Sequence, residues 1–263
     1  MSERVSFEPG PVARVTMNRP GARNALDAQM REALAAALGR AAADPGCRVV
    51  VLAAAGEDFS SGADLDELGA ARADGGVGYV GAFDELCAAV EQQPQPVIAE
   101  VRGGALGAGC LLVASCDLAV AAEDARFGIP SGRLGVVLTY EGVERLVLSV
   151  GPKRAAELLE AGAEIDGTRA AEWGLVNRAV PAEDLRHATD ALARHVAARA
   201  PLSVKGSKRG IRAALENLSL DRSTAGHRVA DFDMMAAEAF GSRDLAEGIA
   251  AYRERRRPQF EGR

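Results

Sequence analysis

Two glycine-containing turns are the segments of this sequence best suited to chemistry. Residues 59–65 read F-S-S-G-A-D-L, and residues 103–109 read G-G-A-L-G-A-G. Each turn follows an apolar run, at 49–52 or 96–101, and precedes a segment of helical character. At such junctions, unpaired backbone N–H groups point outward at the positive end of a helix dipole. Two of them could bind a carbonyl oxygen that gains negative charge; alternatively, the glycines simply allow close packing.

Other chemistry associated with glycine-rich turns does not fit the spacing. A dinucleotide fingerprint that starts at Gly107 requires glycine at position 112, where the chain has Leu112. The chain has no G-x-x-x-x-G-K-[ST] loop, and neither Ser60 nor Ser61 lies in a G-x-S-x-G motif. No cluster of histidine, cysteine and carboxylate residues has metal-ligand spacing, so no metal site is predicted.

The composition is that of a soluble globular protein with an acidic excess. Apolar residues make up 48% and charged residues 26% of the chain, and the formal charge is −6. An acidic chain without a basic face is not expected to bind nucleic acid. The absence of a signal core and of an apolar run of about 18 residues predicts no membrane association and a cytoplasmic location. The four cysteines lack C-x-x-C spacing, which favours free, buried thiols.

Apolar periodicity predicts an α/β body followed by a helical tail. Strands that alternate with helices are expected to pair in parallel through crossover helices. Asp27 is expected to cap the first long helix, and Asp44 begins the turn that ends it. The predicted strands are 11–17, 49–52, 96–101, 118–122 and 175–180. The predicted helices are 26–43, one from about 64, 77–92, one from about 106, 140–149, 152–161, 183–199, 202–215, 219–240 and 243–256.

A few charged residues elsewhere have a structural explanation. Glu100 falls in a strand that should be buried, so its carboxylate is expected to form an interior ion pair, with Arg102 or Arg133 as candidate partners. The histidines are expected at the surface because they lie among charged residues of the tail; they are His187, His195 and His227.

Segments spread along the whole chain resemble the crotonase (enoyl-CoA hydratase/isomerase) superfamily. They begin with N-R-P-x-x-R-N-A-L at 18–26 and the F-S-S-G-A-D-L turn. They continue with P-V-I-A-x-V-x-G-x-A-L-G-A-G-C from Pro96 and C-D-L-A-V-A-A-E-D-A-R-F-G-I-P at 116–130. Shorter matches follow in the same order: R-L at 145–146, V-G at 150–151, W-G-L-V at 173–176 and D-x-x-E-G-I at 244–249. Each segment alone is modest, but the ordered set is specific.

The resemblance implies both a fold and a ligand. The fold would be a crotonase-type α/β spiral of ββα units over residues 1–195, with a helical region at 196–263 that packs subunits into homotrimers or homohexamers. The ligand would be an acyl-CoA thioester, with no cofactor beyond its coenzyme A moiety. Its carbonyl would lie between two backbone N–H groups, here assigned to Ser61 and Ala108. Typical members have glycine at the second position; alanine keeps the N–H but places a methyl group beside the thioester.

The resemblance also carries over a set of residues that usually line the coenzyme A channel. Arg23 would contact the coenzyme A moiety; the alternative, which the resemblance makes the weaker one, is an ordinary exposed arginine in a turn. The full set is Arg23, Ala25, Leu26, Ala63, Asp64 and Leu65.

The carboxylate pair that family hydratases use to add water is absent. The first carboxylate would follow G-C of the second turn, where this chain has Leu111, and the second would follow F-G-x-P, where it has Ser131. One group of such a pair activates water and the other protonates the α-carbon, and each contributes about 10²–10⁴-fold in rate. Hydratase activity is therefore expected to be very weak, and Leu111 makes the usual water site apolar.

Three residues further along could compensate for this loss. Thr139 stands where some hydrolase, isomerase and dehalogenase relatives have aspartate, but a hydroxyl is a poor base at neutral pH. Glu141 could act as a proton shuttle if an apolar pocket raised its pKa. Its alternative role is to begin a helix, where a carboxylate is favourable with the dipole. Tyr140 is a candidate acid or a wall of the pocket.

The sequence therefore leaves three functional hypotheses. The first is an isomerase, decarboxylase or thioester hydrolase that uses two N–H groups to stabilise a thioester enolate. The second is a non-catalytic acyl-CoA-binding protein in which the same site only holds the ligand. The third is a weak enoyl-CoA hydratase.

Overall fold

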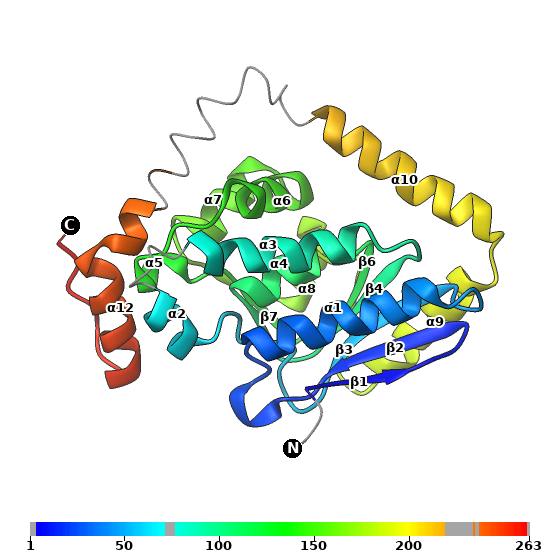
Figure 1. Ribbon diagram of the computed structural model, residues 1–263, viewed down its shortest axis with the longest axis horizontal. Coiled ribbons are helices and arrows are strands. Elements are labelled where there is room, and N and C mark those ends of the chain that lie inside the picture. Colours follow the sequence, from blue (N-terminus) through cyan, green and yellow to red (C-terminus); the bar gives the residue numbers. More distant parts are fainter. Residues whose placement is uncertain (1–3, 72–76, 219–233, 235–236, 262–263) are drawn as a thin grey trace.

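The larger of two sheets has six strands in a computed structural model that describes residues 4–71, 77–218, 234 and 237–261 (Figure 1). Its strand order is β1-β2-β3-β4-β6-β9. Only β1 is antiparallel to its neighbour; the other pairs are parallel, as the alternation of strands and helices predicts. The strands are β1 (Val5–Glu8), β2 (Val12–Met17), β3 (Val49–Ala54), β4 (Val97–Val101), β6 (Leu118–Ala122) and β9 (Arg178–Val180).

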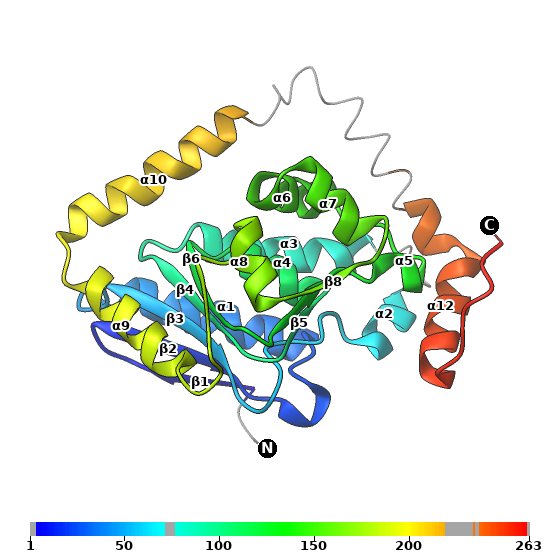
Figure 2. The ribbon, with the colours of Figure 1, turned by 180° about the vertical axis from the view of Figure 1, so that it is seen from behind.

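Helices cover both faces of this sheet. In β3, Val50 and Leu52 belong to the main core, whereas Val49 and Val51 pack on the opposite face with Ala193 of α9 (Leu185–Ala197). This is why β3 is a continuous apolar run rather than an alternating one. Figures 1 and 2 show α1 (Ala28–Ala43) and α9 on opposite faces. The main-core face also carries α3 (Val77–Glu91) and α4 (Ala108–Ala114).

A smaller sheet of three short strands lies beside the first and was not predicted. It consists of β5 (Gly104–Leu106), β7 (Arg126–Gly128) and β8 (Glu164–Asp166). Three residues are too few to show a two-residue period, so these strands leave no pattern in the sequence. The helices that follow or flank it are α5 (Ser131–Leu134), α6 (Tyr140–Val150), α7 (Pro152–Leu159) and α8 (Gly167–Trp173).

Asp27 and Asp44 bound the first long helix as predicted. The Asp27 carboxylate accepts a hydrogen bond from the Met30 amide at 2.8 Å, and Asp44 is the residue after the last turn of α1. The buried face of α1 is the predicted apolar stripe of Met30, Leu34 and Leu38.

The tail divides into an arm and a helix that returns to the body. The arm, α10 (Pro201–Leu218), extends along one side, and α12 (Arg243–Glu254) lies at the other end (Figures 1 and 2). The side chains of Leu245 and Ile249 in α12 pack in one cluster with Leu68 of α2 (Leu65–Ala71). The helix predicted over 219–240 and His227 fall almost entirely outside the described residues. The division at residue 195 and the trimer or hexamer remain predictions.

Glu100 forms an interior ion pair, but not with either predicted partner. Its carboxylate accepts two hydrogen bonds from the guanidinium of Arg14 at 3.1 and 3.3 Å. Arg14 is 5% exposed and also contacts Asp190 of α9 at 2.6 Å. The prediction of Arg102 or Arg133 was wrong because the sequence does not show that β2 and β4 present side chains to the same face.

The cysteines are unpaired, and the two histidines that the structure describes lie at the surface. All four cysteines are free, and three are buried, whereas Cys116 is half-buried. His187 and His195 are exposed, as predicted. No helix in the described parts of the chain is long and apolar enough to cross a membrane.

A buried lysine holds the α10 arm against the body. Lys208 is 7% exposed, and its ammonium contacts the Asp117 carboxylate at 2.7 Å and the Gln95 carbonyl at 3.1 Å. Burial lowers the pKa of Lys208, and the attraction of Asp117 opposes that effect. Because the ammonium is enclosed by acceptors, it replaces its lost hydration with protein contacts.

Replacing Lys208 should therefore loosen the arm. Lys208→Ala leaves Asp117 without its buried partner, and we expect the free energy of unfolding to fall by about 3 kcal/mol. The matched control is Lys205→Ala, since Lys205 lies one turn earlier, is exposed and makes no ion pair within the described residues. We expect the control to change stability by less than about 0.5 kcal/mol. Urea unfolding measures both, and equal losses would contradict the proposed role of Lys208.

Candidate active site

The two glycine-containing turns lie side by side, joined by backbone hydrogen bonds. The Ser60 amide donates to the Gly104 carbonyl and the Leu106 amide donates to the Ser60 carbonyl, both at 2.9 Å. These two bonds form an isolated parallel bridge between Ser60 and Ala105. The turns therefore meet at the carboxyl ends of β3 and β4, which are neighbours in the large sheet.

Glycine is required where the turns approach each other most closely. Gly62 has a φ of +96°, and a β-carbon there would lie 2.6 Å from the Leu106 carbonyl oxygen and 3.3 Å from the Ala108 amide nitrogen. A β-carbon at Gly109 would lie 2.8 Å from that of Ser60. Close packing is thus one purpose of these glycines, and it brings the backbone of the first turn against the Ala108 amide.

The backbone N–H of Ser61, predicted as the donor from the first turn, is not available to a ligand. The Ser61 N–H donates to the Arg23 carbonyl at 2.9 Å, so it is already engaged inside the protein. The Gly62 N–H in turn donates to the Ser60 hydroxyl at 3.1 Å. By contrast, no hydrogen bond among the described residues uses the N–H of Ala63 or of Ala108. The available pair of amides is therefore Ala63 and Ala108, on the two sides of Gly62.

Asn24 organises the turn that precedes the first helix, a role that the sequence did not reveal. It is 1% exposed and has a φ of +53°, which asparagine tolerates better than most residues. Its side chain donates to the carbonyls of Ala55 and Asp58 at 2.8 Å and accepts from the Arg19 amide. Its carbonyl accepts from the Ser60 hydroxyl. The sequence signal that could have revealed this role is the second asparagine of the motif N-R-P-x-x-R-N-A-L, which is Asn24.

Arg23 lies at the edge of this site, with its side chain 43% exposed. It also adopts a left-handed conformation, with a φ of 52°. Its guanidinium donates to both carboxylate oxygens of Asp58, at 2.6 and 3.3 Å. The hydrogen bond from Arg23 is the main reason why the pKa of Asp58 lies below its ordinary value. Arg23 is therefore exposed but already ion-paired.

Most of the other predicted channel residues support the turn rather than face open solvent. Asp64 accepts a hydrogen bond from Arg19 at 2.7 Å and from the amides of Asp66 and Glu67, so it begins α2. Burial acts to raise the pKa of Asp64, but these hydrogen bonds outweigh it and the pKa is lowered. Among the rest, Ala25 and Leu26 are buried, and Ala63 and Leu65 are half-buried.

An apolar wall continues from the second turn. Leu111 lies three residues after Ala108 on α4, and is 6% exposed. A β-carbon at Gly142 would lie 3.4 Å from Leu111 Cδ1 and 3.2 Å from the Thr139 hydroxyl oxygen, so both side chains lie close to the start of α6. The Thr139 hydroxyl caps α6 by accepting a hydrogen bond from the Gly142 amide at 3.1 Å.

The two ionisable candidates begin α6. Gly142 and Leu146 are on the buried face of α6. Leu148, which is 40% exposed, marks its outer flank and follows Glu141 by seven residues. Since seven residues are close to two helical turns, Glu141 and Leu148 share a flank. Glu141 is half-buried and makes no hydrogen bond or ion pair within the described chain, which favours its alternative role at the helix start. Tyr140 is half-buried at the first position of α6.

Ser131, where the second hydratase carboxylate would stand, is the half-buried first residue of α5. The carbonyl of Ser131 accepts the amides of Gly135 and Val136. No hydrogen bond among the described residues joins it to Ala108 or Thr139. Within the same residues, no group of three histidine, cysteine or acidic side chains could hold a metal ion.

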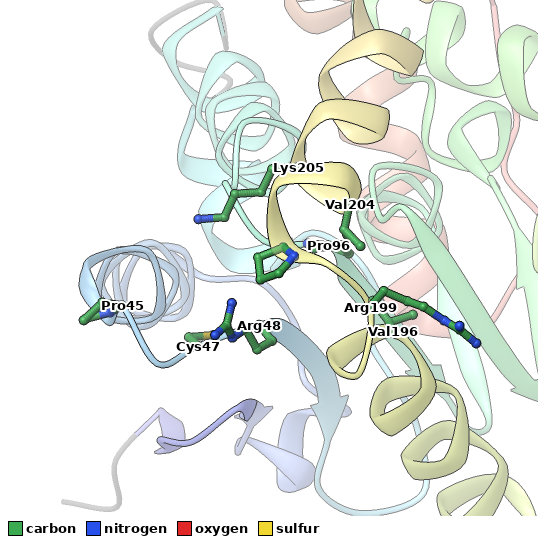
Figure 3. A pocket seen from close by; sticks show the side chains of 9 residues that line it. Pro45, Cys47, Arg48, Pro96, Val196, Arg199, Val204 and Lys205 are labelled. Carbon is green, nitrogen blue, oxygen red and sulfur yellow. The ribbon is translucent and has the colours of Figure 1, made fainter.

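The small pocket in Figure 3 is not part of this site. It is lined by Arg48 and Pro96, which precede β3 and β4, and by Val204 and Lys205 of α10. It therefore lies at the amino ends of the strands, whereas the two turns follow their carboxyl ends. Figure 3 shows the Arg199 side chain directed away from Arg48 and Lys205, so the cations do not converge.

The chain is similar over its whole length to several known proteins. Residues 8–263 match the family model described as enoyl-CoA hydratase/isomerase. The 2,3-dehydroadipyl-CoA hydratase of Escherichia coli (strain K12) is 35% identical over 263 residues, 100% of both chains. An enoyl-CoA hydratase/isomerase structure from Xanthobacter autotrophicus Py2 is 35% identical, with a TM-score of 0.85 over 95% of this chain and 93% of that one. A methylmalonyl-CoA decarboxylase is 27% identical, with a TM-score of 0.89 over 99% of both. The chain belongs to the enoyl-CoA hydratase/isomerase (crotonase) family, as its motifs predict.

Proposed function

We propose that this protein binds an acyl-CoA thioester and stabilises its enolate with the backbone N–H groups of Ala63 and Ala108. The observation that carries this proposal is the contact between the two turns. It brings these amides to either side of Gly62, and no acceptor among the described residues uses them. Donors fixed in advance need no reorganisation when charge develops, and removing one such donor typically costs about 10²–10³-fold in rate.

Coenzyme A would enter along the turn at 19–26, with Arg23 at its edge. The exposed side of the Arg23 guanidinium could pair with a phosphate group of the ligand, since arginine suits this kind of contact. The acyl group would then lie against Leu111, Thr139 and the start of α6. No cofactor besides the coenzyme A moiety is part of the proposal, and the active form would be a homotrimer or homohexamer.

Among enolate reactions, decarboxylation of a malonyl-type CoA ester requires the least from this site. The bond between the α-carbon and the carboxylate breaks, CO₂ leaves, and the bonding electron pair becomes the enolate held by the two amides. Water then supplies one proton to the α-carbon. No base is needed, which suits a site with Leu111 and Ser131 in place of the carboxylates. The similarity to a methylmalonyl-CoA decarboxylase supports this choice.

Removing one N–H without removing its residue tests the amide pair. Ala108 is the first residue of α4, a position at which proline is tolerated, so Ala108→Pro deletes the donor and keeps the helix. The probe is 2-nitronate-propionyl-CoA, an enolate mimic bound by the methylmalonyl-CoA decarboxylase, compared with neutral propionyl-CoA. We expect the wild type to prefer the nitronate and Ala108→Pro to lose that preference by at least about tenfold.

The matched control is Ala108→Gly, which keeps the N–H and removes the methyl group beside the thioester. We expect it to retain the preference within about threefold, because the donor is intact. Equilibrium titration gives the affinities, and thermal unfolding checks that each variant folds. An Ala108→Pro protein that folds and still prefers the nitronate would exclude Ala108 as a donor.

A panel of CoA esters tests the reaction itself. With methylmalonyl-, β-ketoacyl- and crotonyl-CoA as substrates, we expect decarboxylation of the malonyl-type ester. Hydration of crotonyl-CoA should be at least about 10⁴-fold slower than with a hydratase that has both carboxylates, since each contributes 10²–10⁴-fold. Glu141→Gln should decarboxylate within about threefold of the wild type, because no base is required.

The other outcomes of this panel separate the remaining hypotheses. Turnover that Glu141→Gln abolishes would indicate that Glu141 is a proton shuttle, as isomerisation requires. Tight binding of every ester without turnover would indicate a non-catalytic acyl-CoA-binding protein. Rapid hydration of crotonyl-CoA would show that Leu111 and Ser131 do not prevent water addition.

A further inference from the structure

Asp58 connects three separate parts of the proposed site. It immediately precedes the first glycine-containing turn, and its side chain is 15% exposed. One carboxylate oxygen accepts the Gly104 amide of the second turn at 2.6 Å. The other accepts the Arg23 guanidinium at 2.6 Å. Its backbone carbonyl accepts the side chain of Asn24 at 2.8 Å.

We propose that Asp58 is a positioning residue that sets the spacing of the Ala63 and Ala108 amides by fastening the two turns to each other and to Arg23. This inference rests on the proposed function, because it assigns a purpose to the geometry of that amide pair. Asp58 does not touch the proposed ligand position itself; it acts through the backbone of the second turn, four residues before Ala108.

The fit of the Asp58 carboxylate against the second turn is close. A β-carbon at Gly104 would lie 2.9 Å from Asp58 Oδ1, and one at Gly103 would lie 3.0 Å from the same atom. The two glycines therefore leave room for a carboxylate oxygen directly against the backbone. A hydrogen bond from an amide to a charged acceptor is about twice as strong as a neutral one. This contact adds a charged attachment to the backbone bridge at Ser60.

The arginines around Asp58 favour its ionised form. A comparison with the neighbouring Glu164 shows which contact is particular to Asp58. Arg126 lies between two carboxylates, 3.9 Å from Asp58 and 3.8 Å from Glu164. Glu164 also pairs with Arg133 at 3.3 Å. Glu164 belongs to the same chain of charges, but it accepts no hydrogen bond from the backbone of either turn among the described residues. The Gly104 contact therefore distinguishes Asp58 from its neighbours.

The test compares three variants by the preference for 2-nitronate-propionyl-CoA over propionyl-CoA. Because the coenzyme A moiety is common to both probes, the ratio of their affinities reports the amide pair and not the loss of contacts to Arg23. Asp58→Ala removes both carboxylate contacts, and we expect the ratio to fall by about tenfold or more, since small displacements of a preorganised group are costly. Asp58→Asn keeps one of the two acceptor oxygens that Arg23 and Gly104 use, so we expect a smaller fall. Glu164→Gln, the matched control, should keep the ratio within about twofold.

Each outcome supports or overturns a particular statement. A wild-type protein with equal affinity for the two probes would overturn the proposed amide pair, and this inference with it. A clear wild-type preference that Asp58→Ala retains, in a protein whose thermal unfolding shows that it folds, would overturn only the role of Asp58. If Asp58→Ala does not fold, Asp58→Asn decides in the same way, because it preserves the size of the side chain. An equal fall in Glu164→Gln would also overturn the assignment.

Discussion

The pairing of Ser60 with the second turn is the contact on which the proposed site depends. Two backbone hydrogen bonds of 2.9 Å join segments that follow β3 and β4. Each bond contributes only about 0.5–1.5 kcal/mol net. Their effect is geometric, because they hold Gly62 against the Ala108 amide at a distance that no larger residue would permit. The site is therefore specified by backbone contacts, and side chains serve mainly to maintain them.

Buried polar side chains maintain these contacts in a part of the chain that has only a short 3-10 helix, Pro20–Ala22, and isolated β-bridges. Asn24 fastens the turn at 19–26 to the carbonyls of Ala55 and Asp58, just before the first glycine-containing turn, and Asp64 fastens the start of α2 to Arg19. Such groups are costly to bury unless every polar atom has a partner. In the described residues, no buried side-chain nitrogen or oxygen lacks one. The cost of burial thus favours a single arrangement of the loops over alternatives that would leave these groups unpaired.

The long helices and strands were predictable from the sequence, whereas the amide of the first turn that lacks an acceptor in the protein was not. β3, β4, α1 and α3 were predictable because a continuous apolar run or a helical stripe records burial. The motif F-S-S-G-A-D-L predicts that this turn contributes to a ligand site, but it cannot show which backbone N–H is without an acceptor in the protein. That depends on the Arg23 carbonyl, which takes the Ser61 N–H and is remote in sequence. The partner of Glu100 was missed for the same reason: Arg14 lies on a strand whose face only the fold reveals.

The polar and apolar parts of the site are divided in a way that limits its chemistry. Charged groups gather around Arg23 and Asp58, where a coenzyme A moiety would lie, whereas Leu111 and the capped start of α6 line the side proposed for the acyl group. With Leu111 and Ser131 in place of the two hydratase carboxylates, and Glu141 at the helix start as the carboxylate nearest to the proposed acyl position, the proposed site can stabilise negative charge on an oxygen but is poorly equipped to add water. Reactions in which a bond breaks within the substrate and its electron pair forms the enolate are then favoured over reactions in which a base must remove a proton. The proposed amide pair and the contact between the two turns do not involve the side chains at positions 111 and 131, so replacing the hydratase carboxylates there would leave the proposed ligand-binding geometry in place.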